Sequence, residues 1–414
     1  MIFLYDCFIA LYSLVAKLMA IAGHKKAKLW VEGRAGDREE FKKYALQQSP
    51  LRDSPRRIVG QSHQTLWFHF ASLGEYEQGR PVMEKLKSER KNIKIVATFF
   101  SPSGYEYCKD TQLIDYKFYL PADIESNAKK FVEFINPSEV FFIKYEFWYH
   151  YLHILKEKKI PVYLVSGLFR RKQVFFKWYG GLHRKMLSCF THFFVQNESA
   201  QKLLQSLNYN NVTVTGDTRY DRCLQIADTP YINDIIKDFI GQNFCLVAGS
   251  TWTEDENIIL NHTDKFKIIL APHDISRSES LYKQFSDSVL FSQYNNNSDK
   301  NILIIDNIGM LANIYRFASI AYVGGAFGSG LHNIIEPLSH GKPVILGPKT
   351  DKFPEAAEAI NAGVAHQIEM ADELYIIAEK YISNDTYLQQ QQNRAKQFAV
   401  GNKGAAEKIL RGLY

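Results

Sequence analysis

Residues 65–70 read TLWFHF, and the chain runs on through ASLGE (71–75) into a helical pattern over 76–90. The six residues are almost all apolar, aromatic or β-branched, which is typical of a strand that is buried on both faces. The order of buried strand, short loop and helix then recurs along the chain. This alternation predicts an α/β fold in which helices cover both faces of a parallel sheet.

The apolar runs form two series. After 65–70, the first series continues with 94–98, 139–143, 162–166, 192–195 and 212–215. The second series comprises 244–248, 267–271, 302–305, 320–323 and 343–346, and helical patterns over 371–413 follow it. A single core rarely exceeds roughly 250–300 residues. The 414 residues therefore predict two Rossmann-like, doubly wound domains.

We expect three parts along the chain: a membrane-associated segment over 1–23, an N-terminal domain over 24–215, and a C-terminal domain with its terminal helices over 216–414. The polar stretch 216–230 should connect the domains, and the asparagine-rich stretch 295–300 should be a surface loop. Open α/β sheets bind ligands beyond the carboxyl ends of their strands. Two such domains facing each other would place both binding sites in one crevice.

The N-terminal segment is apolar from residue 1 to 23 except for Asp6 and Lys17, and basic residues follow at 25, 26, 28, 34 and 38. About 20 apolar residues suffice to span a bilayer, and the basic flank would keep the rest of the chain in the cytoplasm. The segment has no basic residues at its front and no clear small-residue cleavage site, so we do not expect a cleaved secretory signal. The two embedded charges leave an interfacial helix and a buried core helix as alternatives.

Composition excludes some functions. A net charge of +6 is too small to indicate nucleic acid binding but suits an anionic membrane surface. Five scattered cysteines indicate neither a disulfide framework nor a metal site, and HExxH, DxD and CxxC pairs are absent. Residues 170–185 interleave six basic residues with four aromatic ones. This segment fits either an anionic membrane surface or an ordinary amphipathic helix with a solvated face.

Two carboxylates follow predicted strands of the first domain. Glu75 follows SLG (72–74), where it could act as a general base, or simply favour a helix start by its charge. Glu146, within KYEFW (144–148), has the same placement and the same two interpretations. At the domain boundary, TGDTRYD (215–221) contains Arg219, which could stabilise a leaving phosphate or a substrate carboxylate. The alternative for Arg219 is a surface ion pair with Asp217 or Asp221.

The second domain contains two candidate anion sites. Gly249, Ser250 and Thr251 follow a strand and precede an acidic helix start, which fits either a phosphate site or a capped helix without a ligand. GGAFGSG (324–330) leads into LHNIIEP (331–337) and is too glycine-rich to be explained by packing alone. A nucleotide could approach this backbone closely, and Glu336 could accept hydrogen bonds from its ribose. The stretch is neither a P-loop nor a dinucleotide fingerprint.

Taken in order, these stretches resemble the Kdo (3-deoxy-D-manno-octulosonic acid) transferases of lipopolysaccharide biosynthesis. The resemblance runs from about residue 30 to 370 and rests on an ordered set of motifs. They are WFHFASLGE (67–75), KYEFW (144–148), FFVQNESAQKLL (193–204), VTGDTRYD (214–221), AGSTWTEDE (248–256), LAPHDISR (270–277), IIDNIGML (304–311) and YVGGAFGSGLHNIIEPLSHGKPVILGP (322–348).

The resemblance implies a GT-B glycosyltransferase with an N-terminal acceptor domain and a C-terminal donor domain. The donor would be CMP-Kdo, and the acceptor would be the tetraacylated, bisphosphorylated precursor of lipid A (lipid IVA) at the cytoplasmic face of the inner membrane. Transfer would invert the anomeric centre and need neither metal nor cofactor. A different GT-B enzyme using another nucleotide sugar, such as a UDP-sugar, and a non-catalytic lipid A-binding membrane protein are the alternatives.

The resemblance also implies roles for individual residues. Glu75 matches the proton acceptor, and Glu146 and Arg219 match positions that stabilise the transition state. The segments that match CMP contacts are Pro272 and His273, Ile308, Gly309 and Met310, and Asn333, Ile334, Ile335 and Glu336. The chain departs from the family pattern at four positions: Arg219 replaces a common Lys, Lys144 a common acidic residue, His273 a common Arg and Met310 a common Glu.

Overall fold

The computed structural model describes residues 2–36, 41, 44, 63–108, 112–260, 265–295, 299–328 and 330–414. Of the features singled out in the sequence, Arg38, Ser329 and residues 296–298 of the expected loop lie outside this set. The described chain forms two compact units. Unit 1 comprises Met1–Thr218 with Gly404–Tyr414, and unit 2 comprises Arg219–Lys403.

Unit 1 is built on a parallel sheet of seven strands. In chain order they are β1 (Gln64–Phe70), β2 (Ile93–Phe99), β3 (Tyr116–Tyr119), β4 (Glu139–Ile143), β5 (Val162–Gly167), β6 (His192–Val195) and β7 (Val212–Val214). Their order in the sheet is β3-β2-β1-β4-β5-β6-β7, and every neighbouring pair is parallel. The chain direction therefore reverses between β1 and β4, which is the switch point where such sheets bind ligands.

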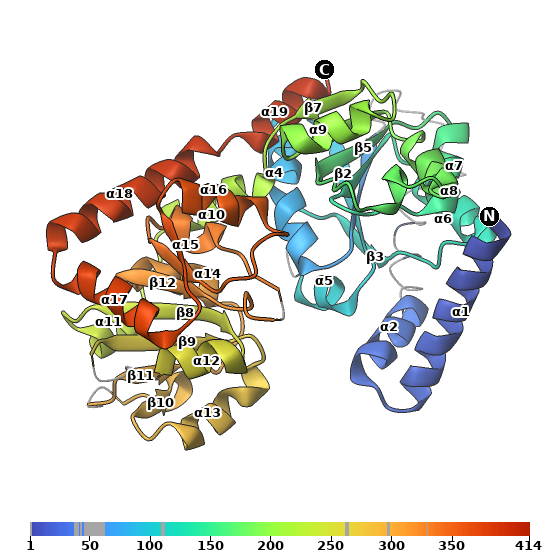
Figure 1. Ribbon diagram of the computed structural model, residues 1–414. Helices are drawn as coiled ribbons and strands as arrows, with labels where there is room; N and C mark the ends of the chain where they lie inside the picture. The colour runs from blue at the N-terminus through green and yellow to red at the C-terminus, as the bar shows by residue number, and fades with distance from the viewer. Residues whose placement is uncertain are drawn as a thin grey trace. The chain divides into compact units, whose positions relative to one another are not determined.

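Helices cover both faces of this sheet (Figure 1). They are α4 (Leu73–Glu89), α5 (Pro102–Tyr107), α6 (Glu125–Ile135), α7 (Tyr149–Glu157), η1 (Val174–Phe176), α8 (Gly181–Leu187) and α9 (Glu198–Gln205). Successive strand residues point to opposite faces. Trp67 accordingly packs in the cluster that contains Phe142, whereas Phe68 stacks on Phe141 in a second cluster. Burial on both faces explains the apolar run of β1, and the predicted α/β class is confirmed.

The last helix of the chain, α19 (Ala405–Gly412), packs in unit 1 beside α4 (Figure 1). Its Ile409 and Leu410 are buried in the same cluster as Phe68, and Glu407 pairs with Lys85 of α4. The expected division assigned all of 216–414 to the second domain, which is wrong for these last residues. Periodicity shows that a helix has an apolar face, but it does not show which core receives that face.

At the N-terminus, α1 (Ile2–Ile21) and α2 (Lys25–Gly36) form a helical hairpin that turns at Gly23 (Figure 1). Ile9 is the buried residue of α1, and most of its other large apolar side chains are exposed. A buried core helix is therefore the wrong interpretation of this segment. Among the described residues, α1 is the one helix that is long and apolar enough to cross a membrane.

Unit 2 repeats the architecture of unit 1. Its strands are β8 (Cys245–Thr251), β9 (Lys267–Pro272), β10 (Ser288–Leu290), β11 (Ile302–Ile304), β12 (Ile320–Val323), β13 (Val344–Leu346) and β14 (Ala365–Gln367). The sheet order is β10-β11-β9-β8-β12-β13-β14, again all parallel. The switch point lies between β8 and β12, and the three short strands β3, β10 and β14 were not predicted from the sequence.

The helices of unit 2 surround this second sheet. They are α10 (Thr218–Asp228), α11 (Asp234–Ile240), α12 (Thr253–Ile259), η3 (Ile275–Arg277), α13 (Ser278–Gln284), η4 (Phe291–Gln293), α14 (Leu311–Ile314), η5 (Tyr315–Phe317), α15 (Ile335–Ser339), α16 (Pro354–Asn361), α17 (Ala371–Ile382) and α18 (Asp385–Gly401). Most of the expected polar connector 216–230 is therefore helical, because α10 occupies it.

Candidate functional site

Glu75 lies in the first turn of α4, directly after β1. Ser72 caps this helix with an extended backbone, and its hydroxyl donates to the Glu75 carboxylate. Gly74 is exposed, and a Cβ at this position would meet nothing nearer than the Ser72 hydroxyl at 3.8 Å. The loop is thus open on the side of the carboxylate, where a substrate hydroxyl can approach.

Glu146 lies in the turn after β4 and is 8% exposed. Its Oε2 accepts a hydrogen bond from the indole N–H of Trp148 at 2.7 Å and lies 3.0 Å from His69 Nε2. The preceding Lys144 has a left-handed backbone, with φ of 66°, which turns the chain sharply after the strand. Two nitrogen atoms therefore fix the position of a nearly buried carboxylate.

His69 connects Glu146 to the interior of the sheet. The Trp67 indole donates to Thr98 Oγ1 at 2.8 Å, and the same oxygen lies 2.8 Å from His69 Nδ1. Because the indole nitrogen can only donate, the Thr98 hydroxyl accepts from it and can donate its own proton to His69 Nδ1. The remaining imidazole proton then sits on Nε2 and points at Glu146. The sequence assigned His69 no role, although a histidine in an otherwise apolar strand was a usable signal.

Glu75 and Glu146 follow adjacent strands. β1 and β4 pair in parallel, with His69 opposite Phe142, so both carboxylates leave the same carboxyl edge of the sheet at the switch point. Gln78 of α4 also contributes to this edge, because its side-chain amide donates to Asp217 at 3.4 Å. Both carboxylates thus follow strands of the first domain, as their positions in the sequence predicted.

Arg219 belongs to unit 2, near the start of α10. Its guanidinium donates to Glu355 Oε1 of α16 at 2.8 Å, and the Glu355 side chain is nearly buried. Sequence reasoning named Asp217 or Asp221 as the alternative partners and could not find Glu355, which is 136 residues away. The ion pair holds the cation at the first turn of its helix.

Unit 2 contains a cavity of about 250 Å³ at the carboxyl edge of its sheet. It is lined by Ser250, Gly309, Leu311, Ala312, Tyr315, Val323, His332, Asn333 and Glu336. Four of these residues were predicted nucleotide contacts: Ser250 at the end of β8, Gly309 in the loop after β11, Asn333 in the loop after β12 and Glu336 at the start of α15. Asn333 donates to Glu336 Oε1 at 3.0 Å and accepts from the Ile335 amide at 3.2 Å.

The other predicted nucleotide contacts lie outside this lining. They are Gly249, Thr251, Pro272, His273, Ile308, Met310, Ile334 and Ile335. Ile334 and Ile335 point their side chains into the core, and the Thr251 hydroxyl donates to Glu256 at 3.1 Å. A Cβ on Gly249 would lie 2.0 Å from the Tyr315 hydroxyl oxygen. Gly249 therefore packs against Tyr315, which lines the cavity.

The start of α12 is occupied by a carboxylate of the protein itself. Asp255 accepts from the backbone amides of Trp252 and Gly325, both at 2.9 Å, and from the Tyr322 hydroxyl at 2.7 Å. Asp255 is almost fully buried. This contact fits the capped-helix interpretation of residues 249–251, and the phosphate site at this helix start stays a prediction.

Two glycines of the 324–330 stretch are required by packing. A Cβ on Gly324 would lie 2.4 Å from the Ser250 carbonyl oxygen. Gly325 has φ of 95°, and a Cβ there would lie 2.2 Å from the Gly330 carbonyl oxygen. The expectation that packing could not explain this stretch is wrong for these two positions, because a tight turn closes against the end of β8.

An aromatic stack flanks the same cavity. The rings of Trp252 and His273 lie 4.7 Å apart between centroids, and His273 lies 4.5 Å from His332. Burial, together with the neighbouring His273, lowers the pKa of His332 to about 4. The Trp252 indole donates to His332 Nε2 at 3.4 Å, so the neutral ring carries its proton on Nδ1. Within the described ranges, no group of three or more His, Cys, Asp or Glu side chains is arranged to hold a metal ion.

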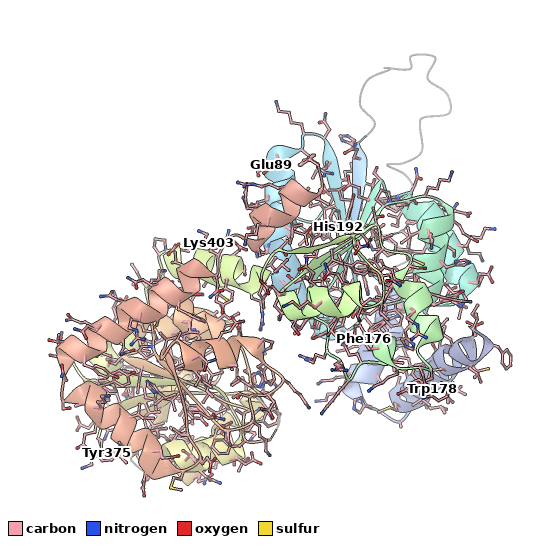
Figure 2. All side chains as sticks on the ribbon, turned by 45° about the horizontal axis from the view of Figure 1, so that its top comes forward. Glu89, Phe176, Trp178, His192, Tyr375 and Lys403 are labelled. Atoms are coloured by element: carbon pink, nitrogen blue, oxygen red, sulfur yellow. The ribbon has the colours of Figure 1, made fainter. Side chains whose placement is uncertain are left out.

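The basic and aromatic segment 170–185 is not one amphipathic helix. It consists of a turn, the short helix η1 and the start of α8. Phe175 is buried, whereas Trp178 is 91% exposed; Figure 2 labels Trp178 and the neighbouring Phe176. Arg184 donates to the carbonyls of Phe175 and Lys177 at 3.1 and 2.7 Å, so one of the basic side chains stabilises the loop.

Comparison with known proteins shows which family this chain is similar to. Residues 39–222 match the family described as 3-Deoxy-D-manno-octulosonic-acid transferase (kdotransferase). The chain is 27% identical to the 3-deoxy-D-manno-octulosonic acid transferase of Aquifex aeolicus, covering 77% of this chain and 86% of the relative. It is 25% identical to the enzyme of the same name from Haemophilus influenzae, covering 84% and 86%.

Solved structures show the same fold at low identity. A UDP-GlcNAc 2-epimerase from Neisseria meningitidis superposes with a TM-score of 0.61 at 17% identity, covering 84% of this chain and 99% of that one. A glycosyltransferase from Rickettsia africae superposes with a TM-score of 0.59 at 16% identity, covering 84% and 97%. These likenesses establish the GT-B type of fold. By the family match over residues 39–222 and by these relatives, this chain is similar to the 3-deoxy-D-manno-octulosonic acid (Kdo) transferases.

Proposed function

We propose that this protein transfers Kdo from CMP-Kdo to lipid IVA, inverting the anomeric centre, without a metal or other cofactor, at the cytoplasmic face of the inner membrane. The observation that carries the proposal is the pair of carboxylates, Glu75 and Glu146, that leave adjacent strands at the switch point of unit 1. Similarity to the Kdo transferases supports the sugar, and the acceptor is the one that the resemblance implies.

Glu75 acts as the general base in this proposal. Its carboxylate lies beside an open loop and accepts the proton of a glucosamine hydroxyl of the acceptor. The hydroxyl oxygen then forms a bond to the anomeric carbon of Kdo while the bond from that carbon to the CMP phosphate oxygen breaks. Attack on the face opposite to CMP inverts the anomeric centre, and CMP leaves with the electron pair of the broken bond.

Glu146 and Arg219 stabilise the charges that develop during this step. Positive charge grows on the sugar as the phosphate departs, and a fixed carboxylate stabilises it. Because His69 and Trp148 hold Glu146 in place, the carboxylate needs no reorganisation at the moment of reaction. Arg219, held by Glu355, supplies the positive charge for the departing phosphate.

The unit 2 cavity receives the nucleotide of the donor. Glu336 accepts hydrogen bonds from ribose hydroxyls, and Ser250, Gly309 and Asn333 present polar groups around it. A volume of about 250 Å³ is close to the lower limit of ligand pockets, roughly 300 Å³. This size supports a nucleoside monophosphate, in keeping with CMP.

The membrane contact is proposed to involve the N-terminal hairpin and the 170–185 segment. α1 exposes most of its large apolar side chains, and Lys25, Lys26 and Lys28 follow it. Trp178 and Tyr179 are exposed among basic residues in the second segment. Apolar side chains with adjacent cations suit an anionic lipid surface.

The test is a transfer assay with the full-length protein, CMP-Kdo and lipid IVA, read by mass spectrometry. A product heavier by one or more Kdo residues supports donor, acceptor and reaction class together. CMP should inhibit the reaction, whereas inhibition by UDP instead would favour a GT-B transferase with a different donor. Binding of lipid IVA and CMP without any product would favour a non-catalytic lipid A-binding protein.

A further inference from the structure

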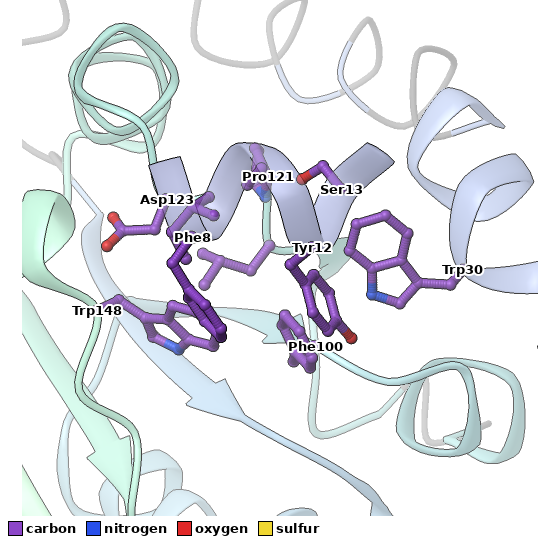
Figure 3. A pocket seen from close by; sticks show the side chains of 11 residues that line it. Phe8, Tyr12, Ser13, Trp30, Phe100, Pro121, Asp123 and Trp148 are labelled. Carbon is purple, nitrogen blue, oxygen red and sulfur yellow. The ribbon is translucent and has the colours of Figure 1, made fainter. Parts of the chain in front are cut away.

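Unit 1 has an apolar cavity of about 110 Å³ between the N-terminal hairpin and the carboxyl edge of its sheet. α1 contributes Phe8, Ile9 and Tyr12 to one wall. The facing wall contains Trp30 of α2, Phe100 after β2 and Trp148 after β4. Figure 3 shows the rings of these walls turned toward one another across the space. Segments that are far apart in the sequence thus enclose a hydrocarbon-like interior.

The walls are held together by ring contacts. Phe100 stacks on Trp148 with centroids 4.9 Å apart, and Tyr12 lies 5.7 Å from Trp30 and 5.9 Å from Phe100. Such aromatic pairs prefer these distances and resist rearrangement. The cavity therefore remains a shaped space between fixed rings.

Polar bonds at one end keep α1 docked on unit 1. The Tyr5 hydroxyl donates to Asp123 at 2.5 Å, and His150 Nε2 lies 2.6 Å from the Asp6 carboxylate. Asp123 also accepts from the His150 and Tyr151 amides at the start of α7, and Figure 3 shows its carboxylate turned away from the cavity. The charge of Asp6, which is unusual in an apolar helix, thus has a structural role. The Asp123 carboxylate points away from the cavity and does not make it polar.

The chemistry of the lining selects the occupant. A buried water needs two to four polar partners, whereas apolar cavities of similar size stay dry and bind hydrocarbons. An apolar cavity of 150 Å³ holds benzene, so about 110 Å³ accommodates roughly four carbon atoms of an alkyl chain. Phe8 and Tyr12 are 62% and 42% exposed, so the cavity adjoins the exposed apolar face of α1.

We propose that this cavity binds part of one acyl chain of the lipid acceptor, a site that rests on the proposed function. One observation favours the acceptor over a bilayer lipid. Trp148 lines the cavity and also donates to Glu146, so a chain held here belongs to a molecule whose head lies near the catalytic edge. The acyl chains of lipid IVA are attached to the disaccharide that would react at this edge. The Arg34 guanidinium lies 3.8 Å from the centroid of the Trp30 ring and donates to the carbonyls of Leu120 and Phe100, so it holds the wall of the cavity in place.

The test fills the cavity and compares two acceptors. Ser13→Phe adds a ring from α1, and Ala122→Leu adds bulk from the loop after β3; both residues line the cavity. Leu14→Phe is the matched control, because Leu14 is on the same helix but is exposed. KM is measured for lipid IVA and for the same bisphosphorylated disaccharide stripped of its acyl chains, both in detergent.

We expect wild type to prefer the acylated acceptor at least tenfold in KM, since each buried methylene contributes appreciably to binding. Both filling variants should reduce this preference about tenfold, and Leu14→Phe should leave it unchanged. A preference that the filling variants retain, or a wild type that does not distinguish the two acceptors, overturns the inference while the proposed function stands. Wild type that gives no product with either acceptor contradicts the proposed function.

A binding measurement keeps the inference testable in that last case. Bromine atoms on an acyl chain quench nearby tryptophans, and Trp30 and Trp148 both line the cavity. Brominated lipid IVA should quench the fluorescence of wild type more than that of Ser13→Phe. Equal quenching of both proteins overturns the inference. Stronger quenching by vesicles of brominated phosphatidylglycerol than by brominated lipid IVA assigns the cavity to bilayer lipid and overturns the choice of the acceptor.

Discussion

The carboxyl edges of the two sheets have the same topology and different chemistry. At the first edge, β1 and β4 lead into side chains that carry charge and protons, with Glu146 bound by His69 and Trp148. At the second edge, the end of β8 and the loops after β11 and β12 enclose a cavity of about 250 Å³, and these two loops contain glycine turns at Gly309 and Gly325. One sheet order thus supports the proposed reacting edge of unit 1 and the proposed binding edge of unit 2.

The chemical difference between the two edges fits the role that is proposed for each of them. A proton acceptor and a charge stabiliser require side chains in fixed positions, and buried hydrogen bonds supply that rigidity. A nucleotide requires space and backbone groups, so small residues at tight turns suffice. Side-chain changes should therefore reduce the rate at the first edge and weaken binding at the second.

The largest effect is expected at Glu75. Glu75→Gln keeps the shape of the side chain but removes the proton acceptor. A general base typically contributes about 10²–10⁴-fold to the reaction rate. We expect kcat to fall by about 10³-fold or more, while the Kd for CMP, measured by calorimetry, stays unchanged. Glu89→Gln, at the exposed far end of the same helix (Figure 2), is the matched control. Full activity of Glu75→Gln would contradict the proposal that Glu75 is the general base.

A smaller loss is expected at the second carboxylate. Glu146→Gln preserves the size of the side chain but loses its charge, and kcat should fall about 10²-fold, as expected when one preorganised electrostatic group is removed. His69→Asn should lower kcat less, because His69 acts on the reaction through Glu146. In the double variant the two losses should not add. Additive losses in steady-state kinetics would show that the two side chains act independently.

The third effect is a pH dependence of stability in unit 2. The pKa of His332 is about 4 in the folded protein, below the usual 6.5, so the unfolded chain binds more protons between these values. The stabilisation is therefore fully present above about pH 6.5 and is lost as pH falls toward 4. The pKa shift limits the contribution of His332 to the free energy of unfolding to about 3 kcal/mol, and the partial exposure of the ring reduces this contribution.

Urea denaturation of wild type and His332→Gln at pH 7 and pH 4 measures this effect. We expect the free energy of unfolding of wild type to fall by about 2 kcal/mol more than that of the variant. His340→Gln provides an internal comparison, because burial also lowers the pKa of His340 to about 4. Identical pH dependence of wild type and His332→Gln would exclude the histidine as the titrating group.

The smallest effect is expected at Glu336. Glu336→Gln keeps the cavity but weakens the acceptor of the ribose hydrogen bonds. The binding free energy of CMP should fall by about 1.4 kcal/mol, which is a tenfold increase in its Kd. Glu279→Gln, on the surface of the same unit, should not change binding. Isothermal titration calorimetry separates the two. An unchanged Kd for CMP in Glu336→Gln would place the nucleotide elsewhere in unit 2.

The central strands of both sheets were predictable because each is an apolar run that is buried on both faces. The edge strands β3, β10 and β14 were missed, because none of them is a continuous apolar run: Lys117 interrupts β3, Ser288 begins β10, and β14 ends with His366 and Gln367. For the site, motif residues such as Ser250, Asn333 and Glu336 do line one cavity. His69 stood out as a histidine in an apolar strand, whereas His332 and Asp255 could not be assigned, because their roles depend on residues far away in the sequence.

The sequence alone determined the alternation of strands and helices, the family motifs and the positions of Glu75 and Glu146 after strands, because these depend on local composition and on residue order. The tertiary structure decided which groups meet. It docked α19 on unit 1, set Arg219 against Glu355 and seated α1 beside Trp148 to enclose an apolar cavity. Such pairings depend on hydrogen bonds and packing between segments that are distant in the sequence, so the local sequence pattern does not predict them.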